Sequence, residues 1–306
     1  MPEIREIASG LKFPEGPIAM PDGDVILVEI ARGTLTRVRP DGSSVVIAEP
    51  GGGPNGAAVG PDGKLYVCNN GGFEWHDVAG LLFPGRQPKD YSGGRIERID
   101  PDNGEVEVLY REVDGHGLRG PNDIVFDRAG GFWFTDHGKI RARERDRGGI
   151  YYAKTDGSMI KEVVYGMHAP NGIGLSPDEK RLFVAETPTG RVWKYDIIGE
   201  GEVEKSEGAR PPGDLVVGLP GMQLFDSLAI DSRGHLCVAT LLSGGISSIS
   251  PDGSQVDFTE FGDPLTTNIC FGGKDLKTAF VTLSATGRLV SCRWPVAGSP
   301  LNFLNK

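Results

Sequence analysis

Six oxygen-bearing side chains occupy one repeated position in this sequence, and their chemical types are those of a cation site. Two are carboxylates and four are amides, a set that suits a hard divalent cation whose charge the two carboxylates would balance. A structural zinc site would normally use Cys or His instead. A cation with open coordination positions polarises a carbonyl group and lowers the pKa of bound water, which favours hydrolytic chemistry. The six residues are Glu15, Asn55, Asn122, Asn171, Asp226 and Asn268.

A simpler explanation exists for any single copy. Pro-Asn-Gly and Pro-Glu-Gly are common turn sequences, so one such residue alone carries little information. Turn chemistry does not explain why two of the six residues are carboxylates and none is Ser or Lys. The whole set therefore favours a shared site, while the turn reading stays open for each copy.

The elements that position these residues are repeated strands. Residues 120–138 are typical of a strand that begins near Asn122, a turn at 128–131 and a second strand that ends at Asp136. Five further copies follow the same pattern, and each is followed by a third strand that opens on glycine and commonly by a fourth. Four strands per copy and six copies predict an all-β fold, a six-bladed β-propeller formed by residues 1–306 as one domain. Equivalent inner-strand positions of a propeller converge on the central channel, so we expect the six side chains to face one another.

Two insertions and one strand complete the predicted ring. Residues 3–8 precede the first copy and are the natural outer strand of the last blade, since an open blade would expose a strand edge. Residues 70–92 interrupt the second blade and contain an aromatic stretch around Phe73, Trp75 and Phe83. Residues 139–148 interrupt the third blade. Long insertions on one face of a regular scaffold commonly cover a binding site.

Charge and composition exclude several classes of partner. The net charge of −10 and the pI near 5.1 argue against nucleic acid and anionic membranes, which require a basic face. The basic run 139–147 is interrupted by acids and is interpreted as a solvated loop. The beginning of the sequence lacks the apolar core of a signal peptide and no apolar run is long enough to span a bilayer, so we expect a cytoplasmic protein. Four scattered cysteines are expected to be buried small hydrophobes: Cys68, Cys237, Cys270 and Cys292.

Several of these motifs together resemble the senescence-marker-protein/gluconolactonase family, which includes regucalcin and bacterial sugar lactonases. The matching segments are 13–17 (Phe-Pro-Glu-Gly-Pro), 120–125 (Gly-Pro-Asn-Asp-Ile-Val), 169–178 and 267–276. The resemblance covers essentially the full length and implies a six-bladed propeller with one catalytic divalent cation. It implies Glu15, Asn122, Asn171 and Asp226 as the ligands, with Asp226 also as the general base that takes a proton from water.

The sequence departs from the family pattern where the substrate would bind. Asp226 lies in Phe-Asp-Ser, where Pro-Asp-Gly is usual, and residues 135–138 read Thr-Asp-His-Gly, where many relatives continue Asp-Pro. The aromatic insertion is not a feature of the sugar lactonases. The resemblance thus supports the cation site more strongly than it supports any particular sugar.

Five further residues are candidates for binding substrate near the cation. Asn69 and Asp136 each end a second strand fourteen residues after a member of the ring, and the alternative is that they hydrogen-bond loop backbone. His137 and His116 are candidates for proton transfer or for the channel mouth, against the alternative of structural roles. Asn268 is the sixth member of the ring.

The sequence therefore predicts a metal-dependent lactonase that opens a cyclic ester to a hydroxy acid, with a small-molecule lactone as its partner. Ca²⁺ is the expected ion, with Mn²⁺, Zn²⁺ and Mg²⁺ as alternatives, and the oligomeric state is left open. Two other hypotheses are retained. One is a phosphotriester or fluorophosphate hydrolase with the same site, and the other is a non-enzymatic propeller that binds metal or a partner. The sequence lacks the Gly-x-Ser-x-Gly motif that would indicate a serine esterase.

Overall fold

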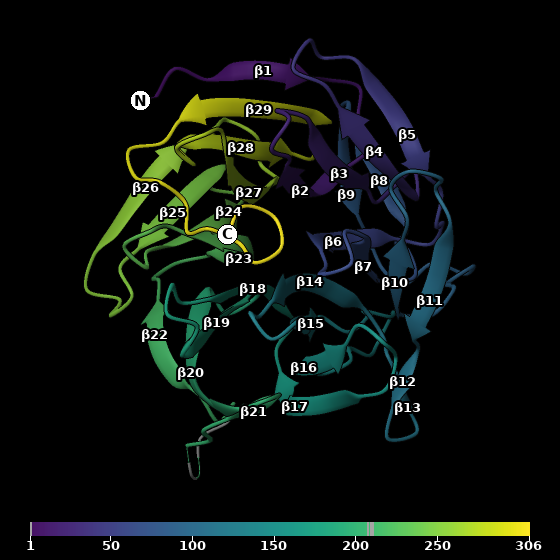
Figure 1. The fold of residues 1–306 in the computed structure, drawn as a ribbon, viewed down its shortest axis with the longest axis vertical. Coiled ribbons are helices and arrows are strands. Elements are labelled where there is room, and N and C mark those ends of the chain that lie inside the picture. Colours follow the sequence, from purple (N-terminus) through teal and green to yellow (C-terminus); the bar gives the residue numbers. More distant parts are fainter. Residues whose placement is uncertain (1, 207, 209–210) are drawn as a thin grey trace.

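The chain forms a ring of six antiparallel sheets around a central channel (Figure 1). The structure is a computed structural model that describes residues 2–206, 208 and 211–306. That part of the chain contains strands and no helix. The predicted all-β, six-bladed β-propeller is confirmed.

Each blade has four strands, numbered here from the channel outward. The innermost strands are β2 (Pro14–Ala19), β6 (Pro54–Val59), β14 (Pro121–Phe126), β18 (Pro170–Leu175), β23 (Leu224–Ile230) and β27 (Thr266–Gly272). The second strands are β3 (Val25–Glu29), β7 (Leu65–Asn69), β15 (Gly131–Asp136), β19 (Arg181–Glu186), β24 (Leu236–Leu241) and β28 (Thr278–Leu283).

The outer half of each blade is more exposed to solvent. The third strands are β4 (Thr34–Val38), β10 (Arg95–Ile99), β16 (Gly148–Lys154), β20 (Arg191–Gly199), β25 (Gly245–Ile249) and β29 (Arg288–Arg293). The fourth strands are β5 (Ser44–Ala48), β11 (Val106–Tyr110), β17 (Ile160–Met167), β22 (Asp214–Gly218), β26 (Val256–Glu260) and β1 (Arg5–Ala8). A short strand, β21 (Glu202–Val203), also pairs with β20.

The ring is closed by the two ends of the described chain. Strand β1 pairs antiparallel with β29, so the first strand completes the last blade. This closure was predicted from the sequence, and it protects the edge of β29 that would otherwise be unpaired. Adjacent blades contact one another mainly through their innermost strands. Aromatic side chains of the second and third strands, such as Trp133, Tyr66 and Tyr152, are fully buried. All four cysteines are buried and unpaired, as expected.

The Pro-Glu-Gly and Pro-Asn-Gly motifs have a packing reason. A Cβ atom on Gly16 would lie 2.5 Å from the carbonyl oxygen of Asn55, and one on Gly56 would lie 2.4 Å from that of Asn122. At these positions the innermost strand approaches the backbone of the next blade so closely that only glycine fits. The same holds for Gly172, whose Cβ would lie 2.6 Å from the backbone nitrogen of Leu228.

The insertion at 70–92 is a hairpin that lies over neighbouring blades. It contains β8 (Trp75–Val78) and β9 (Leu81–Pro84), which Figure 1 shows beside the strands of the first blade. The Leu82 N–H donates to the carbonyl of Ala285 in the last blade at 3.0 Å. A second, smaller hairpin of β12 (Glu112–Val113) and β13 (His116–Gly117) stands at the outer edge of the ring.

The interpretation of residues 139–147 as a solvated loop is wrong for Lys139. Its side chain is only 1% exposed, and its ammonium donates to Asn70 Oδ1 at 3.0 Å and to the carbonyl of Gly72 at 2.6 Å. The ammonium also lies 3.9 Å from the centre of the Phe73 ring. Lys139 therefore ties the two insertions together, a long-range contact that local charge patterning does not reveal.

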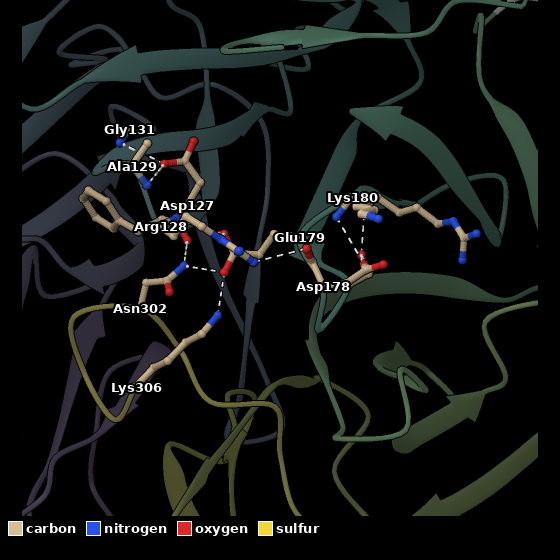
Figure 2. A network of polar contacts seen from close by, with 12 residues as sticks. Asp127, Arg128, Ala129, Gly131, Asp178, Glu179, Lys180, Asn302 and Lys306 are labelled. Carbon is tan, nitrogen blue, oxygen red and sulfur yellow. Dashed lines mark hydrogen bonds and ion pairs between the residues drawn. The ribbon is translucent and has the colours of Figure 1, made fainter. Parts of the chain in front are cut away.

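The C-terminal segment closes one end of the channel. Residues 299–306 cross the centre of the ring in Figure 1 and line a cavity of about 110 Å³ inside the channel. Figure 2 shows how the segment is held. Glu179 accepts hydrogen bonds from Asn302 at 3.1 Å and from Lys306 at 2.6 Å, and its other oxygen accepts from the backbone and side chain of Arg128.

Candidate metal centre

The six residues of the predicted ring all lie at the beginning of the innermost strands, on the same face of the propeller. In every blade the pairing between the first and second strands shifts register at this point. Such a bulge bends the strand and re-aims a side chain, here at the entrance of the channel. The residues involved are Glu15, Asn55, Asn122, Asn171, Asp226 and Asn268.

Glu15 is a buried carboxyl group with one oxygen already occupied. Its Oε2 accepts the N–H of Gly16 at 2.6 Å and the Nδ2 of Asn268 at 2.7 Å, which orient the group. Only 2% of Glu15 is exposed, and this burial raises its pKa from 4.5 to about 7, against the effect of its hydrogen bonds. Its Oε1 is left without a hydrogen bond among the described residues and is free for a ligand.

Asp226 is the second carboxyl group of the ring, and its pKa is affected by the charge of the first, Glu15. Burial and then the negative charge of Glu15 raise its pKa well above the ordinary value, while hydrogen bonding from Asn171 lowers it. The residue as a whole has an intermediate exposure to solvent. Two carboxylates that repel each other in a buried place are stabilised by a cation between them.

Asn122 supplies a direct sign of a missing partner. Its Oδ1 is buried and has no hydrogen-bond donor among the described residues. A buried unpaired carbonyl oxygen costs about 1–3 kcal/mol, so it calls for a ligand. Asn171, in the next blade, is held by its Nδ2 on Thr187 Oγ1 at 3.2 Å, and its Oδ1 meets only a weak donor, Ser227, at 3.5 Å.

These observations fit a divalent cation held by Glu15, Asn122, Asn171 and Asp226. In the described part of the chain, no three His, Cys, Asp or Glu side chains form a group that would hold a metal by themselves. A cation here must therefore take amide oxygens as well as carboxylates. That requirement favours a hard ion that accepts neutral oxygen ligands, which is the chemistry of Ca²⁺.

Sequence reasoning missed a third carboxyl group, Asp123. It is buried, and burial followed by the charge of Glu15 raises its pKa from 3.8 to about 8. Its two oxygens accept the N–H groups of Ile124 at 2.9 Å and Ile173 at 3.3 Å, so it lines the cavity below the ring. A signal existed in the sequence, because the third copy has a carboxylate at the position where the first, second and fourth copies have glycine.

Asn69 and Asp136 hold the loops that enter the innermost strands. Asn69 Oδ1 accepts the N–H of Gly53, and Asp136 accepts the N–H groups of Arg119 and Gly120, each at 2.7 to 2.9 Å. Both side chains are almost completely buried. Their contacts are those of the alternative in which they bond loop backbone and thereby set the position of the ring residues.

The two histidines occupy different places. His137 lies at the end of the third blade's second strand on the face of the ring, and its N–H donates to Gly120 at 2.8 Å. Burial, followed by the positive charge of Arg145, lowers its pKa from 6.5 to about 3, so the imidazole is neutral. The carboxylate oxygens of Asp136 accept backbone N–H groups, and Asp136 does not pair with the His137 side chain. His116 is exposed in the hairpin at the outer edge, away from the ring.

The aromatic hairpin lies on the same face as the ring. Trp75 packs on Phe13, with ring centres 5.0 Å apart, and Phe73 packs on Trp75 at 6.1 Å. Phe13 comes two residues before Glu15, and Ala285, which binds Leu82, follows the last blade's second strand. The hairpin therefore packs within this chain and places apolar side chains next to Glu15. Its aromatic side chains remain partly exposed.

Comparison with known proteins gives the family. A model described as SMP-30/gluconolactonase/LRE-like region matches residues 13–285. The chain belongs to this family. Among curated proteins, a gluconolactonase of Zymomonas mobilis is 27% identical over 92% of this chain and 79% of its own length. The lactonase drp35 of Staphylococcus haemolyticus is 30% identical over 80% of this chain and 68% of its own length.

Solved structures show the same fold. The calcium-binding protein regucalcin from Agrobacterium tumefaciens superposes with a TM-score of 0.77 at 18% identity, covering 100% of this chain and 98% of that one. A gluconolactonase from Xanthomonas campestris gives a TM-score of 0.74 at 21% identity, covering 95% and 89%. In the part of the chain that the structure describes, no helix has the length and apolar character needed to cross a membrane.

Proposed function

We propose that this protein is a divalent-cation-dependent lactonase that opens a cyclic ester to a hydroxy acid. The unpaired Oδ1 of Asn122, set beside two mutually repelling carboxyl groups, is the observation that carries the cation requirement. The lactone-hydrolysing activity is supported by the curated family members named gluconolactonase and lactonase. Glu15, Asn122, Asn171 and Asp226 would hold the ion, with Ca²⁺ favoured by the oxygen ligands.

When bound, the cation supplies Lewis-acid polarisation of the ester carbonyl and lowers the pKa of water. The side chains do the rest. Asp226 accepts a proton from the attacking water. It returns that proton to the alkoxy oxygen of the lactone when the acyl carbon–oxygen bond breaks. Gly16 and Asn268 hold Glu15 with its Oε1 turned to the site, and Thr187 holds Asn171.

Asp226 suits the role of base better than its neighbours. Glu15 is 2% exposed and Asp123 is 8% exposed, whereas Asp226 is a residue of intermediate exposure, although it also accepts hydrogen bonds from Asn171 and Ser227. Burial and the charge of Glu15 raise the pKa of Asp226, which favours it as a proton acceptor, and a bound cation would oppose that shift and keep the group ionised.

Acid release measured in a pH-stat tests the proposal. The metal-stripped protein is assayed on five- and six-membered lactones, and each divalent ion is added back singly. Hydrolysis restored by an ion and lost in Asp226→Asn supports the proposal. Absence of acid release from every lactone with every ion would refute it, and turnover of a phosphotriester under the same conditions would then favour the phosphotriester hydrolase.

A further inference from the structure

A group of positive and imidazole side chains stands on the face of the ring, over the third and fourth blades. We call it the cationic rim, and it consists of Arg145, Arg147, His137 and His168. Arg147 contacts the Nε2 of His168, and the positive charge of Arg145 acts on His137. The rim belongs to no part of the mechanism described above.

The rim lies next to two proposed cation ligands. His168 comes three residues before Asn171, and the N–H of His168 is held by Glu186 at 2.7 Å. His137 donates its N–H to Gly120 at 2.8 Å, two residues before Asn122. The rim therefore lies at the channel entrance, on the side of Asn122 and Asn171. The apolar hairpin lies on the side of Glu15.

The positive charges of the rim are not balanced by acids. The acids of the same loop are used elsewhere, since Arg141 pairs with Asp146 at 2.5 Å and with Glu144 at 3.3 Å. Among the described residues, Arg145 and Arg147 form no ion pair with a carboxylate. Partial burial and then Arg147 lower the pKa of Arg145, which is the effect of cations that lack a counter-charge.

The loop that carries the arginines is held in place. Ile140 pairs with Arg145 in an isolated bridge, and the N–H of Arg141 donates to the carbonyl of Glu144 at 2.8 Å. The N–H of Asp146 donates to the carbonyl of Lys139 at 3.0 Å, and Asp146 Oδ2 accepts the N–H of Lys139 at 3.1 Å. Because buried Lys139 anchors this loop to the other insertion, the backbone that carries the two arginines is positioned before any ligand arrives.

We propose that the cationic rim binds a carboxylate carried by the lactone, so that the preferred substrate is an anionic lactone whose product is a hydroxy dicarboxylate. This inference rests on the proposed lactonase function and names its substrate class. Arg is the side chain best suited to hold a carboxylate, through paired N–H donors. On a protein with a net charge of −10, a local positive rim also directs an anion to this entrance.

The test compares two lactones of one ring size, γ-butyrolactone and its γ-carboxylate derivative, in the presence of the activating ion. The wild-type protein should prefer the carboxylate by kcat/KM. Arg145→Gln and Arg147→Gln should each lower the ratio of the two kcat/KM values about tenfold, as expected for loss of one charged hydrogen bond. Added NaCl should lower the ratio as well. Arg143→Gln, a matched control in the same loop, should leave the ratio unchanged.

A binding measurement separates this inference from the lactonase proposal. Isothermal titration with glutarate should give a signal with the wild-type protein and with Arg143→Gln, and a much weaker one with Arg145→Gln. Glutarate binding without hydrolysis of any lactone would support the anion site and refute the lactonase. Hydrolysis of both lactones with a ratio that Arg145→Gln and Arg147→Gln do not change would refute the anion site and leave the lactonase standing.

Discussion

At the scale of single residues, the ring is an incomplete set of charges and dipoles. Glu15 and Asp226 are two buried carboxyl groups with raised pKa values. Asn122 has a buried Oδ1 that accepts no hydrogen bond from the described residues. Asp123 adds a third carboxyl group just below, with its own pKa raised to about 8. One positive ion at the channel entrance, as proposed, would relieve all three features.

Replacement of Asp226 by Asn separates catalysis from folding. The amide cannot accept a proton from water, so we expect kcat to fall by about 10³-fold. The same change removes the repulsion with Glu15, so the melting temperature of the cation-free protein should stay the same or rise. Thermal melting and pH-stat kinetics of one preparation measure both. A variant that loses stability along with activity would show that Asp226 is mainly structural.

The cation-free protein should lose stability as pH rises from about 4.5 to about 7. Folded Glu15 holds its proton up to a pKa of about 7, whereas the unfolded group releases it near 4.5. The folded state therefore binds more protons in this window, and the free energy of unfolding falls with increasing pH. Urea unfolding at pH 5 and pH 7.5, with and without Ca²⁺, measures the effect. The stabilisation by Ca²⁺ should be larger at pH 7.5, and an equal effect at both pH values would contradict the assignment of Glu15.

At the scale of elements, the repeat was predictable and the insertions were not. Six copies of one strand–turn–strand pattern predicted the blades and the ring position, because each copy is encoded within a short run of consecutive residues. Closure by β1 is a long-range contact that was predicted from the need to pair the open edge of the last blade. The path of the hairpin at 73–84 was not predictable, since it depends on contacts of Trp75 with Phe13 and of Leu82 with Ala285. Burial of Lys139 was missed for the same reason.

The two insertions are joined by Lys139, and its burial gives a pH dependence of opposite sign. Burial lowers its pKa from 10.5 to about 7, while Asp136 and Asp146 act against the shift. The unfolded chain then holds a proton that the folded chain has released between pH 7 and 10.5, so this group makes stability rise with pH in that range. Lys139→Met should remove the rise. Urea midpoints of both proteins at pH 7 and pH 9.5 measure the rise. If the midpoint changed equally with pH in both proteins, the lowered pKa of buried Lys139 would be contradicted.

At the scale of the whole molecule, a propeller has two openings and this chain treats them differently. One face carries the ring, the apolar hairpin and the cationic rim, while the other is closed by residues 299–306. The C-terminal segment lines part of the cavity of about 110 Å³ between them. If the ring binds a cation and a lactone as proposed, the substrate would reach them from the face that carries the ring, because the C-terminal segment lies across the other end.

Glu179 is the residue on which this closure depends, and Glu179→Ala tests it. The change removes the acceptors of Asn302, Lys306 and Arg128 shown in Figure 2. Because Lys306 and Arg128 are exposed, we expect a loss of only about 1–2 kcal/mol in unfolding free energy. The hydrogen bonds of Glu179 lower its pKa from 4.5 to about 2, against the effect of burial, so wild-type stability from this group is present above pH 4.5 and lost as pH falls toward 2.

Limited proteolysis reports the state of the segment itself. Carboxypeptidase B, which releases a C-terminal Lys, should remove Lys306 from Glu179→Ala faster than from the wild-type protein at pH 7.5, because the variant no longer binds Lys306 and Asn302. Asp178→Ala is the matched control, since Asp178 bonds Ser176 and Lys180 and its side chain does not touch the segment. If both variants were cleaved at the wild-type rate, the segment would be held by packing of Phe303 on Phe126 rather than by Glu179. Closure of the channel would then be an apolar contact, insensitive to pH.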